Sequence, residues 1–294
     1  MNNKLKGTGV AIVTPFLTTG EVDFEGLDRL LNHLLEGNVD FIVALGTTSE
    51  AATLTTAEKA EVMSFVKSKI VGKIPLVMGL GGNNTRAIID QIATTDFTGI
   101  DALLSVAPYY NKPNQRGLYA HFAAIAQASP LPVILYNVPG RTSSNLMADT
   151  TLALANDFGN IVAVKEASGD LGQIMEIIRR KPAGFSVLSG DDAFTFAMMA
   201  LGAEGVISVV ANALPAEFAR MVDLCLQGKM EEARTHHYQI LPVIDLLFAD
   251  GNPAGVKAAL NFLGICDNNL RLPLVPVKQE VKQALEKALA HFGL

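Results

Sequence analysis

The feature that most restricts the fold is a regular alternation of short apolar runs with longer amphipathic stretches over the first two-thirds of the chain. The apolar runs are nearly continuous in hydrophobicity, which is typical of parallel strands covered on both faces. They predict strands at Val10–Thr14, Phe41–Leu45, Leu76–Gly79, Ala102–Val106, Val133–Asn137, Ile161–Lys165, Ser186–Ser189 and Gly205–Val209. The stretches between them predict helices at Phe24–Glu36, Ala57–Ile70, Thr85–Asp96, Gly117–Ala128, Asp149–Asn156, Leu171–Arg180 and Asp192–Ala200.

The spacing of these elements favours one architecture. From one predicted strand to the next the interval is roughly 20 to 35 residues, which is the length of a βα unit. Eight such units within about 210 residues favour an α/β fold of the closed (β/α)8 type, the TIM barrel, over an open doubly wound sheet.

The strand pattern stops after Leu214. Four further helices are predicted, at Ala216–Gln227, Lys229–Phe248, Pro253–Leu263 and Lys278–Phe292. No low-complexity linker isolates them, so we expect them to pack on the barrel or on another subunit. The expected organisation is a catalytic barrel over residues 1–225, followed by a C-terminal helical region over residues 226–294.

Composition excludes several classes of protein. The formal charge of -6, without a basic block, argues against binding to nucleic acid or to an anionic membrane surface. Cys225 and Cys266 form neither a metal-binding spacing nor a disulfide framework, which suits a reducing cytosol. His236-His237 lacks the HExxH pattern and is expected at the surface. No signal region and no apolar run of membrane-spanning length is found, so we expect a cytoplasmic protein.

Lys165 is the residue with the clearest chemical potential. It ends the predicted strand Ile161–Lys165, and catalytic groups of barrels lie at the carboxyl ends of strands. Desolvation there lowers the pKa of an amine, and only the unprotonated amine attacks a carbonyl. Taken alone, this segment leaves open the alternative that the side chain simply reaches solvent.

Further polar residues follow other strands, so they are expected around the same mouth. Gly46-Thr47-Thr48 is either a plain turn or a nest of N–H groups and hydroxyls for a small carboxylate. Tyr136 is either a structural tyrosine or, beside a reactive lysine, a proton relay. Arg141 is either solvated or binds a carboxylate through two parallel hydrogen bonds of its guanidinium.

Taken in order, these segments resemble the dihydrodipicolinate synthase family of class I Schiff-base pyruvate lyases and aldolases. The resemblance covers essentially the whole chain. It rests on Gly46-Thr47-Thr48, Pro108-Tyr109-Tyr110-Asn111, Tyr136-Asn137-Val138-Pro139-Gly140-Arg141-Thr142, Val164-Lys165-Glu166-Ala167, Ser189-Gly190-Asp191-Asp192 and Gly205-Val206-Ile207-Ser208.

The resemblance implies a reaction. Lys165 forms an imine with pyruvate, the derived enamine attacks L-aspartate 4-semialdehyde, and ring closure gives 4-hydroxy-tetrahydrodipicolinate in lysine (diaminopimelate) biosynthesis. No metal and no organic cofactor is implied.

The resemblance also implies a role for each site residue. Tyr136 shuttles protons with Thr47 and with Tyr110 of a neighbouring subunit. The remaining implied roles are those of Thr48 for the pyruvate carboxylate, Arg141 for the semialdehyde carboxylate, and the main chain of Gly190 and Ile207 as pocket lining. A tyrosine that crosses an interface implies a homodimer, and the usual state of the family is a homotetramer of two such dimers.

The chain departs from the family pattern in two places. Ser49 stands where a glycine is usual, which carries a penalty if that backbone needs a positive φ. Members inhibited by L-lysine carry histidines at the positions of Thr56 and Lys59 and a glutamate at that of Ala87. Asn83 and Tyr109 match those members, but loss of the acidic group predicts weak or absent lysine inhibition.

Two alternatives remain open at the level of sequence. A sister enzyme, such as N-acetylneuraminate lyase or a 2-keto-3-deoxy sugar-acid aldolase, would share Lys165 and Tyr136. Arg141 favours a small anionic aldehyde over a sugar. A barrel that binds a keto acid as a sensor, without turnover, is the second alternative, although a mere binding site has no need of a hydroxyl relay.

Overall fold

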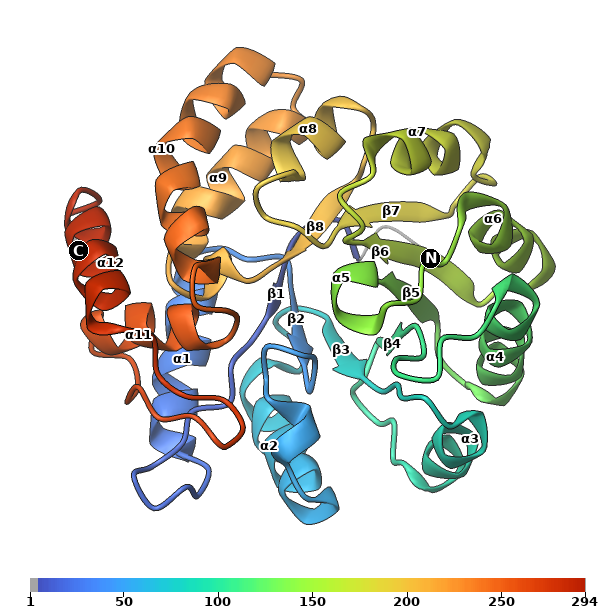
Figure 1. Cartoon of the computed structure of the whole chain (residues 1–294), viewed down its shortest axis with the longest axis horizontal. Coiled ribbons are helices and arrows are strands. Elements are labelled where there is room, and N and C mark those ends of the chain that lie inside the picture. Colours follow the sequence, from blue (N-terminus) through green and yellow to red (C-terminus); the bar gives the residue numbers. More distant parts are fainter. Residues whose placement is uncertain (1–4, 294) are drawn as a thin grey trace.

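Eight parallel strands form a closed barrel in the computed structural model of the chain, which describes residues 5–293. Each strand pairs with the next, and the last pairs with the first, so the predicted (β/α)8 barrel is confirmed (Figure 1). The strands are β1 (Gly7–Ala11), β2 (Phe41–Ala44), β3 (Leu76–Gly79), β4 (Ala102–Val106), β5 (Val133–Asn137), β6 (Ile161–Glu166), β7 (Ser186–Ser189) and β8 (Gly205–Ser208).

Helices follow the strands. Those that the amphipathic stretches predicted cover the outside of the barrel, whereas the four-residue helix after β5 was not predicted. These helices are α1 (Phe24–Glu36), α2 (Thr56–Ile70), α3 (Thr85–Thr94), α4 (Gln115–Ala128), α5 (Pro139–Thr142), α6 (Ala148–Asp157), α7 (Leu171–Arg180), α8 (Thr195–Ala200) and α9 (Pro215–Leu226). Helix α1 begins where its cap predicts, because the Asp23 carboxylate accepts a hydrogen bond from the Gly26 N–H at 2.9 Å.

The largest differences from the predicted boundaries are three residues, at both ends of β1 and at the start of α8, and each has a local reason. Strand β1 begins at Gly7 rather than Val10, because its Gly-Thr-Gly start has weak strand propensity but pairs with both β2 and β8. Helix α8 begins at Thr195 rather than Asp192. The Asp192 carboxylate instead accepts hydrogen bonds from the N–H groups of Val209 and Val210, both at 2.9 Å, and so joins the ends of β7 and β8.

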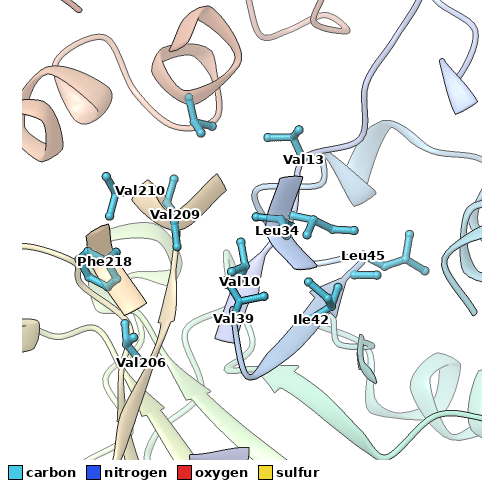
Figure 2. Close-up of a cluster of buried hydrophobic side chains, with 14 of the residues drawn as sticks. Val10, Val13, Leu34, Val39, Ile42, Leu45, Val206, Val209, Val210 and Phe218 are labelled. Atoms are coloured by element: carbon cyan, nitrogen blue, oxygen red, sulfur yellow. The ribbon is translucent and has the colours of Figure 1, made fainter. Parts of the chain in front are cut away.

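Side chains alternate between the lumen of the barrel and the layer under the helices. Val10 and Val206 belong to the outer layer, where they share one hydrophobic cluster with Leu34 of α1 and Phe218 of α9 (Figure 2). The lumen holds a separate cluster of Ala11, Phe41, Val43, Val77, Ala102, Leu104, Ile134, Tyr136, Val138, Val162, Ala163, Leu188 and Ile207. A (β/α)8 barrel is therefore filled by side chains below its mouth, and only the mouth is free for chemistry.

Three helices follow α9: α10 (Met230–Phe248), α11 (Ala254–Phe262) and α12 (Gln279–Ala290). Helix α10 packs against α8, α9, α11 and α12, and the three helices gather on one flank of the barrel (Figure 1). His237 of α10 corrects the expectation of a surface histidine pair, because it is buried and stacks on Phe196 with 5.4 Å between the ring centroids. The division of the chain at residue 225 stays a prediction.

Asn212 holds the seam where the barrel closes. It lies in the 3-10 turn η3 (Val210–Asn212) after β8 and is fully buried. Its Nδ2 donates to the Ala11 carbonyl at 2.9 Å, and its Oδ1 accepts from the Val13 N–H at 3.2 Å. One side chain thus supplies hydrogen-bond partners for backbone groups at the point where β1 leaves the sheet. This replaces strand pairing there and explains why β1 ends before the predicted Thr14.

Replacement of Asn212 by alanine should lower the free energy of unfolding by about 3 kcal/mol, because it strips the buried backbone of β1 of these partners. Chemical denaturation followed by circular dichroism measures the change. The control is Asn156→Ala, which removes a single bond to the Leu152 carbonyl within α6 and should cost about 1 kcal/mol. Equal losses in the two variants would contradict a special role for the seam.

Candidate active site

A cavity of 630 Å³ opens at the carboxyl ends of the strands. It contains six of the eight residues predicted for the site: Thr47, Thr48, Tyr136, Arg141, Lys165 and Gly190. These residues come from the ends of β2, β5, β6 and β7 or from the segments that follow. Convergence of separate strand ends on one mouth is how a (β/α)8 barrel builds a catalytic site.

Lys165 and Tyr136 form the centre of the cavity. They are direct partners in the pairing of β5 with β6, so their side chains point to the same side of the sheet. The Lys165 Nζ lies 4.4 Å from the centroid of the Tyr136 ring, and the two residues are only 4% and 7% exposed. The alternative in which Lys165 simply reaches solvent is therefore wrong.

Gly190 leaves the space that the lysine side chain occupies. A Cβ atom at this position would lie 2.9 Å from Lys165 Cε and 2.8 Å from Ala167 Cβ, closer than real side chains pack. The Gly190 N–H donates to the Glu166 carbonyl at 2.8 Å, which fixes the loop after β7 beside β6. Glycine is thus needed at this position for close packing.

The Gly46–Thr48 segment forms one wall, and a residue from the C-terminal region completes it. Asn252 lies between α10 and α11, and its Nδ2 donates to Thr48 Oγ1 at 3.0 Å. Because the Thr48 oxygen accepts this bond, its own hydrogen is free to be donated into the cavity. The sequence itself does not indicate a role for Asn252, because Gly251-Asn252-Pro253 signals only a break between helices.

Arg141 supplies an accessible cation at the rim of the cavity. Its side chain is exposed, and its guanidinium lies 3.5 Å from the Asn252 carbonyl. It forms no ion pair with any other residue between 5 and 293, so its charge is available to an anionic ligand. Asp191 lines the same cavity, and burial raises the pKa of its carboxyl group.

Two predicted residues lie outside this cavity. Ile207 has its side chain in the lumen cluster, to which Tyr136 also belongs. Tyr110 is 87% exposed and has a left-handed backbone, with φ of 71°. Within residues 5–293 no hydrogen bond joins Tyr136, Thr47 and Tyr110, so the implied relay is not connected within the single chain.

Ser49 causes no backbone strain in place of the usual glycine, because its φ is not positive. The left-handed residue of this loop is the next one, Glu50, with φ of 53°, whereas Ser49 is not in that region. The Ser49 hydroxyl donates to the Ile12 carbonyl at 2.6 Å, and the Ser49 carbonyl accepts from the Thr14 hydroxyl at 2.8 Å. Serine therefore ties the loop after β2 to the segment after β1.

The chemistry available at this site is that of an amine, a phenol and hydroxyls facing a partly enclosed space, with a guanidinium at the rim. A lysine amine in such a setting forms Schiff bases with carbonyl compounds. Among the described residues no group of three His, Cys, Asp or Glu side chains could hold a metal ion. None of the helices between residues 5 and 293 combines the length and the apolar composition that crossing a membrane requires.

Comparison with known proteins identifies the family. The model of the dihydrodipicolinate synthetase family matches residues 4–292. A 4-hydroxy-tetrahydrodipicolinate synthase of Parabacteroides distasonis is 50% identical over 290 residues, which cover 99% of this chain and 98% of the relative.

Two solved structures are also similar over their full lengths. The dihydrodipicolinate synthase of Acinetobacter baumannii, chloride inhibited and complexed with pyruvate, is 40% identical with a TM-score of 0.95, covering 98% of this chain and 99% of that chain. The enzyme of Cyanidioschyzon merolae, with lysine bound, is 42% identical with a TM-score of 0.94, covering 98% of each chain. The chain described here therefore belongs to the dihydrodipicolinate synthetase family, and it is a lyase.

Proposed function

We propose that this enzyme condenses pyruvate with L-aspartate 4-semialdehyde through a Schiff base on Lys165, giving 4-hydroxy-tetrahydrodipicolinate in lysine biosynthesis. The observation that carries the proposal is the buried Lys165 amine against the Tyr136 ring, inside a cavity that also holds Arg141. The similarity to a relative that was solved with pyruvate supports the choice of the keto acid.

The first half of the reaction uses the residues around Lys165. Its amine attacks C2 of pyruvate and water leaves as the imine forms, while Tyr136 transfers the protons that these steps require. Loss of a proton from C3 then gives the enamine. Thr48, whose hydroxyl hydrogen is left free by Asn252, donates to the pyruvate carboxylate.

The second half joins the two substrates. The enamine carbon attacks the aldehyde carbon of the semialdehyde, whose oxygen takes up a proton. The amine of the semialdehyde then attacks the imine carbon and displaces the Lys165 nitrogen, which closes the ring and frees the enzyme. In this scheme Arg141 holds the semialdehyde carboxylate, the main chain of Gly190 and Ile207 lines the pocket, and no metal or organic cofactor takes part.

We further propose that the active unit is a homodimer in which Tyr110 completes the relay of the other subunit. The Asn83 amide donates to the Tyr109 carbonyl at 3.2 Å, and the Asn111 amide donates to the Asn83 carbonyl at 3.0 Å. These bonds hold the segment in a shape that projects Tyr110 into solvent. An aromatic ring held exposed by a strained backbone is typical of a contact surface.

More apolar surface lies close to this tyrosine pair. Pro273 and Leu274, together with Tyr109, line a second cavity that adjoins the first and shares Tyr136 and Arg141 with it. Leu272 in the same segment is 80% exposed. Such a patch suits an interface between copies of the chain. Assembly of two dimers into a homotetramer in the cytoplasm is part of the same proposal.

Arg141→Ala should lower kcat/KM for the semialdehyde by about a hundredfold, because it removes a charge-assisted fork onto the substrate carboxylate. The KM for pyruvate should change little. A coupled assay with both substrates measures the effect. Arg179→Ala on α7 is the control, since Arg179 pairs with Glu176 alone among the residues that the structure describes. Full activity of the Arg141 variant toward the semialdehyde would refute the assignment of the second substrate.

Lysine inhibition should be weak or absent. The second cavity, of 460 Å³, contains Lys59, and its one acidic residue, Glu50, is already paired with Lys257 at 2.5 Å. The ammonium of Lys59 therefore repels a cationic effector without an opposing free carboxylate.

Titration of the activity with L-lysine into the millimolar range measures the inhibition. The triple variant Thr56→His/Lys59→His/Ala87→Glu restores the pattern of inhibited members and should become more sensitive than the wild type. Strong inhibition of the wild type at submillimolar lysine would show that the charge argument is wrong.

A further inference from the structure

We propose that Lys257 of α11 is a positioning residue for the loop that carries Thr47 and Thr48. Its ammonium binds the Glu50 carboxylate and thereby fixes the backbone at the end of that loop. The inference rests on the proposed function, in which this loop holds the pyruvate carboxylate.

The Lys257 ammonium is entirely enclosed by protein. Its Nζ lies 2.5 Å from Glu50 Oε1, and neither side chain is exposed. The same nitrogen donates to the Asn269 carbonyl at 2.8 Å and lies 4.1 Å from the centroid of the Phe16 ring. The ammonium is therefore satisfied by a carboxylate, a carbonyl and a ring face, all in fixed positions.

The Glu50 carboxylate is held from the C-terminal region on both of its oxygens. Oε1 faces the Lys257 ammonium, and Oε2 accepts a hydrogen bond from the backbone N–H of Arg271 at 3.0 Å. Arg271 is itself anchored, because its guanidinium donates to the Thr53 carbonyl at 2.9 Å and pairs with Glu58 at the start of α2. The loop after β2 is thus bound to a segment more than two hundred residues away in the chain.

Glu50 also has a backbone that needs such support. Its φ of 53° is in the left-handed region, which is unfavourable for a residue with a side chain and persists only where the surroundings impose it. The Glu50 N–H donates to the Thr47 carbonyl at 3.1 Å, so this conformation is coupled directly to the first threonine of the loop. Release of the carboxylate would let Glu50 relax and move both threonines.

A buried ion pair is a poor means of stabilising a fold, because desolvation of the two charges offsets most of their attraction. A pair of apolar side chains would fill the same space at less cost. The ion pair instead fixes the position of the Glu50 side chain and backbone. Glu50 is two residues after Thr48, which lines the cavity. Asn252, from the same C-terminal region, also holds this loop, because its side chain donates a hydrogen bond to the Thr48 hydroxyl.

Lys257→Met should raise the KM for pyruvate about tenfold, whereas kcat at saturating pyruvate should change by less than about threefold, because the chemical groups stay in place once pyruvate is bound. Glu50→Gln should act in the same direction. The double variant Glu50→Gln/Lys257→Met, which leaves neither charge unpaired, should raise KM no more than either single change, because the two residues act as a unit.

Glu204→Gln is the matched control. Glu204 faces Lys6 at 3.4 Å and Lys181 at 3.5 Å before the amino end of β8, on the opposite face of the barrel. This variant should keep the pyruvate KM of the wild type. Circular dichroism and thermal unfolding establish which variants are folded.

An unchanged pyruvate KM in a folded Lys257→Met or double variant would overturn the inference. So would failure of all three ion-pair variants to fold, because the pair would then serve the whole structure rather than the loop. The proposed function fails separately, and takes this inference with it, if the wild type does not turn over pyruvate with the semialdehyde.

Discussion

The pairing of β5 with β6 is the constraint on which the rest of this structure depends. Because Tyr136 lies directly opposite Lys165 in a parallel pair, the phenol and the amine must point to the same side, into the mouth of the barrel. A shift of the register by one residue would turn one of them into the apolar layer under the helices. Closure of all eight strands prevents such a shift, and seam contacts such as those of Asn212 maintain closure.

The polar groups of the mouth are held by segments that are distant in the chain. Asn252 lies 204 residues after Thr48, and it contacts both that hydroxyl and the Arg141 guanidinium. Lys257 follows five residues later and holds Glu50. The C-terminal region is therefore part of the site rather than an accessory to it. A barrel that lacked it would keep the buried Lys165 amine but would lose the contacts that fix the loop of Thr47 and Thr48.

Much of this fold follows from local sequence patterns. Strands β3, β4, β5 and β7 were predicted without error, because each is a short apolar run with clear boundaries. The location of the cavity could also be predicted from the sequence, because the carboxyl ends of the strands of a barrel lie on one face. The contacts of Asn252 and Lys257 could not be predicted, because they depend on how the turn between α10 and α11 folds back over the mouth. Nothing local to Gly251-Asn252-Pro253 indicates that geometry.

The central claim is that the Lys165 amine becomes covalently linked to pyruvate. Incubation of the enzyme with pyruvate and borohydride, followed by peptide mass spectrometry, tests it most directly. The expected result is a reduced pyruvate adduct on the peptide that contains Lys165, and none when pyruvate or borohydride is omitted. An unmodified Lys165 at saturating pyruvate, or an adduct on a different lysine, would contradict the claim.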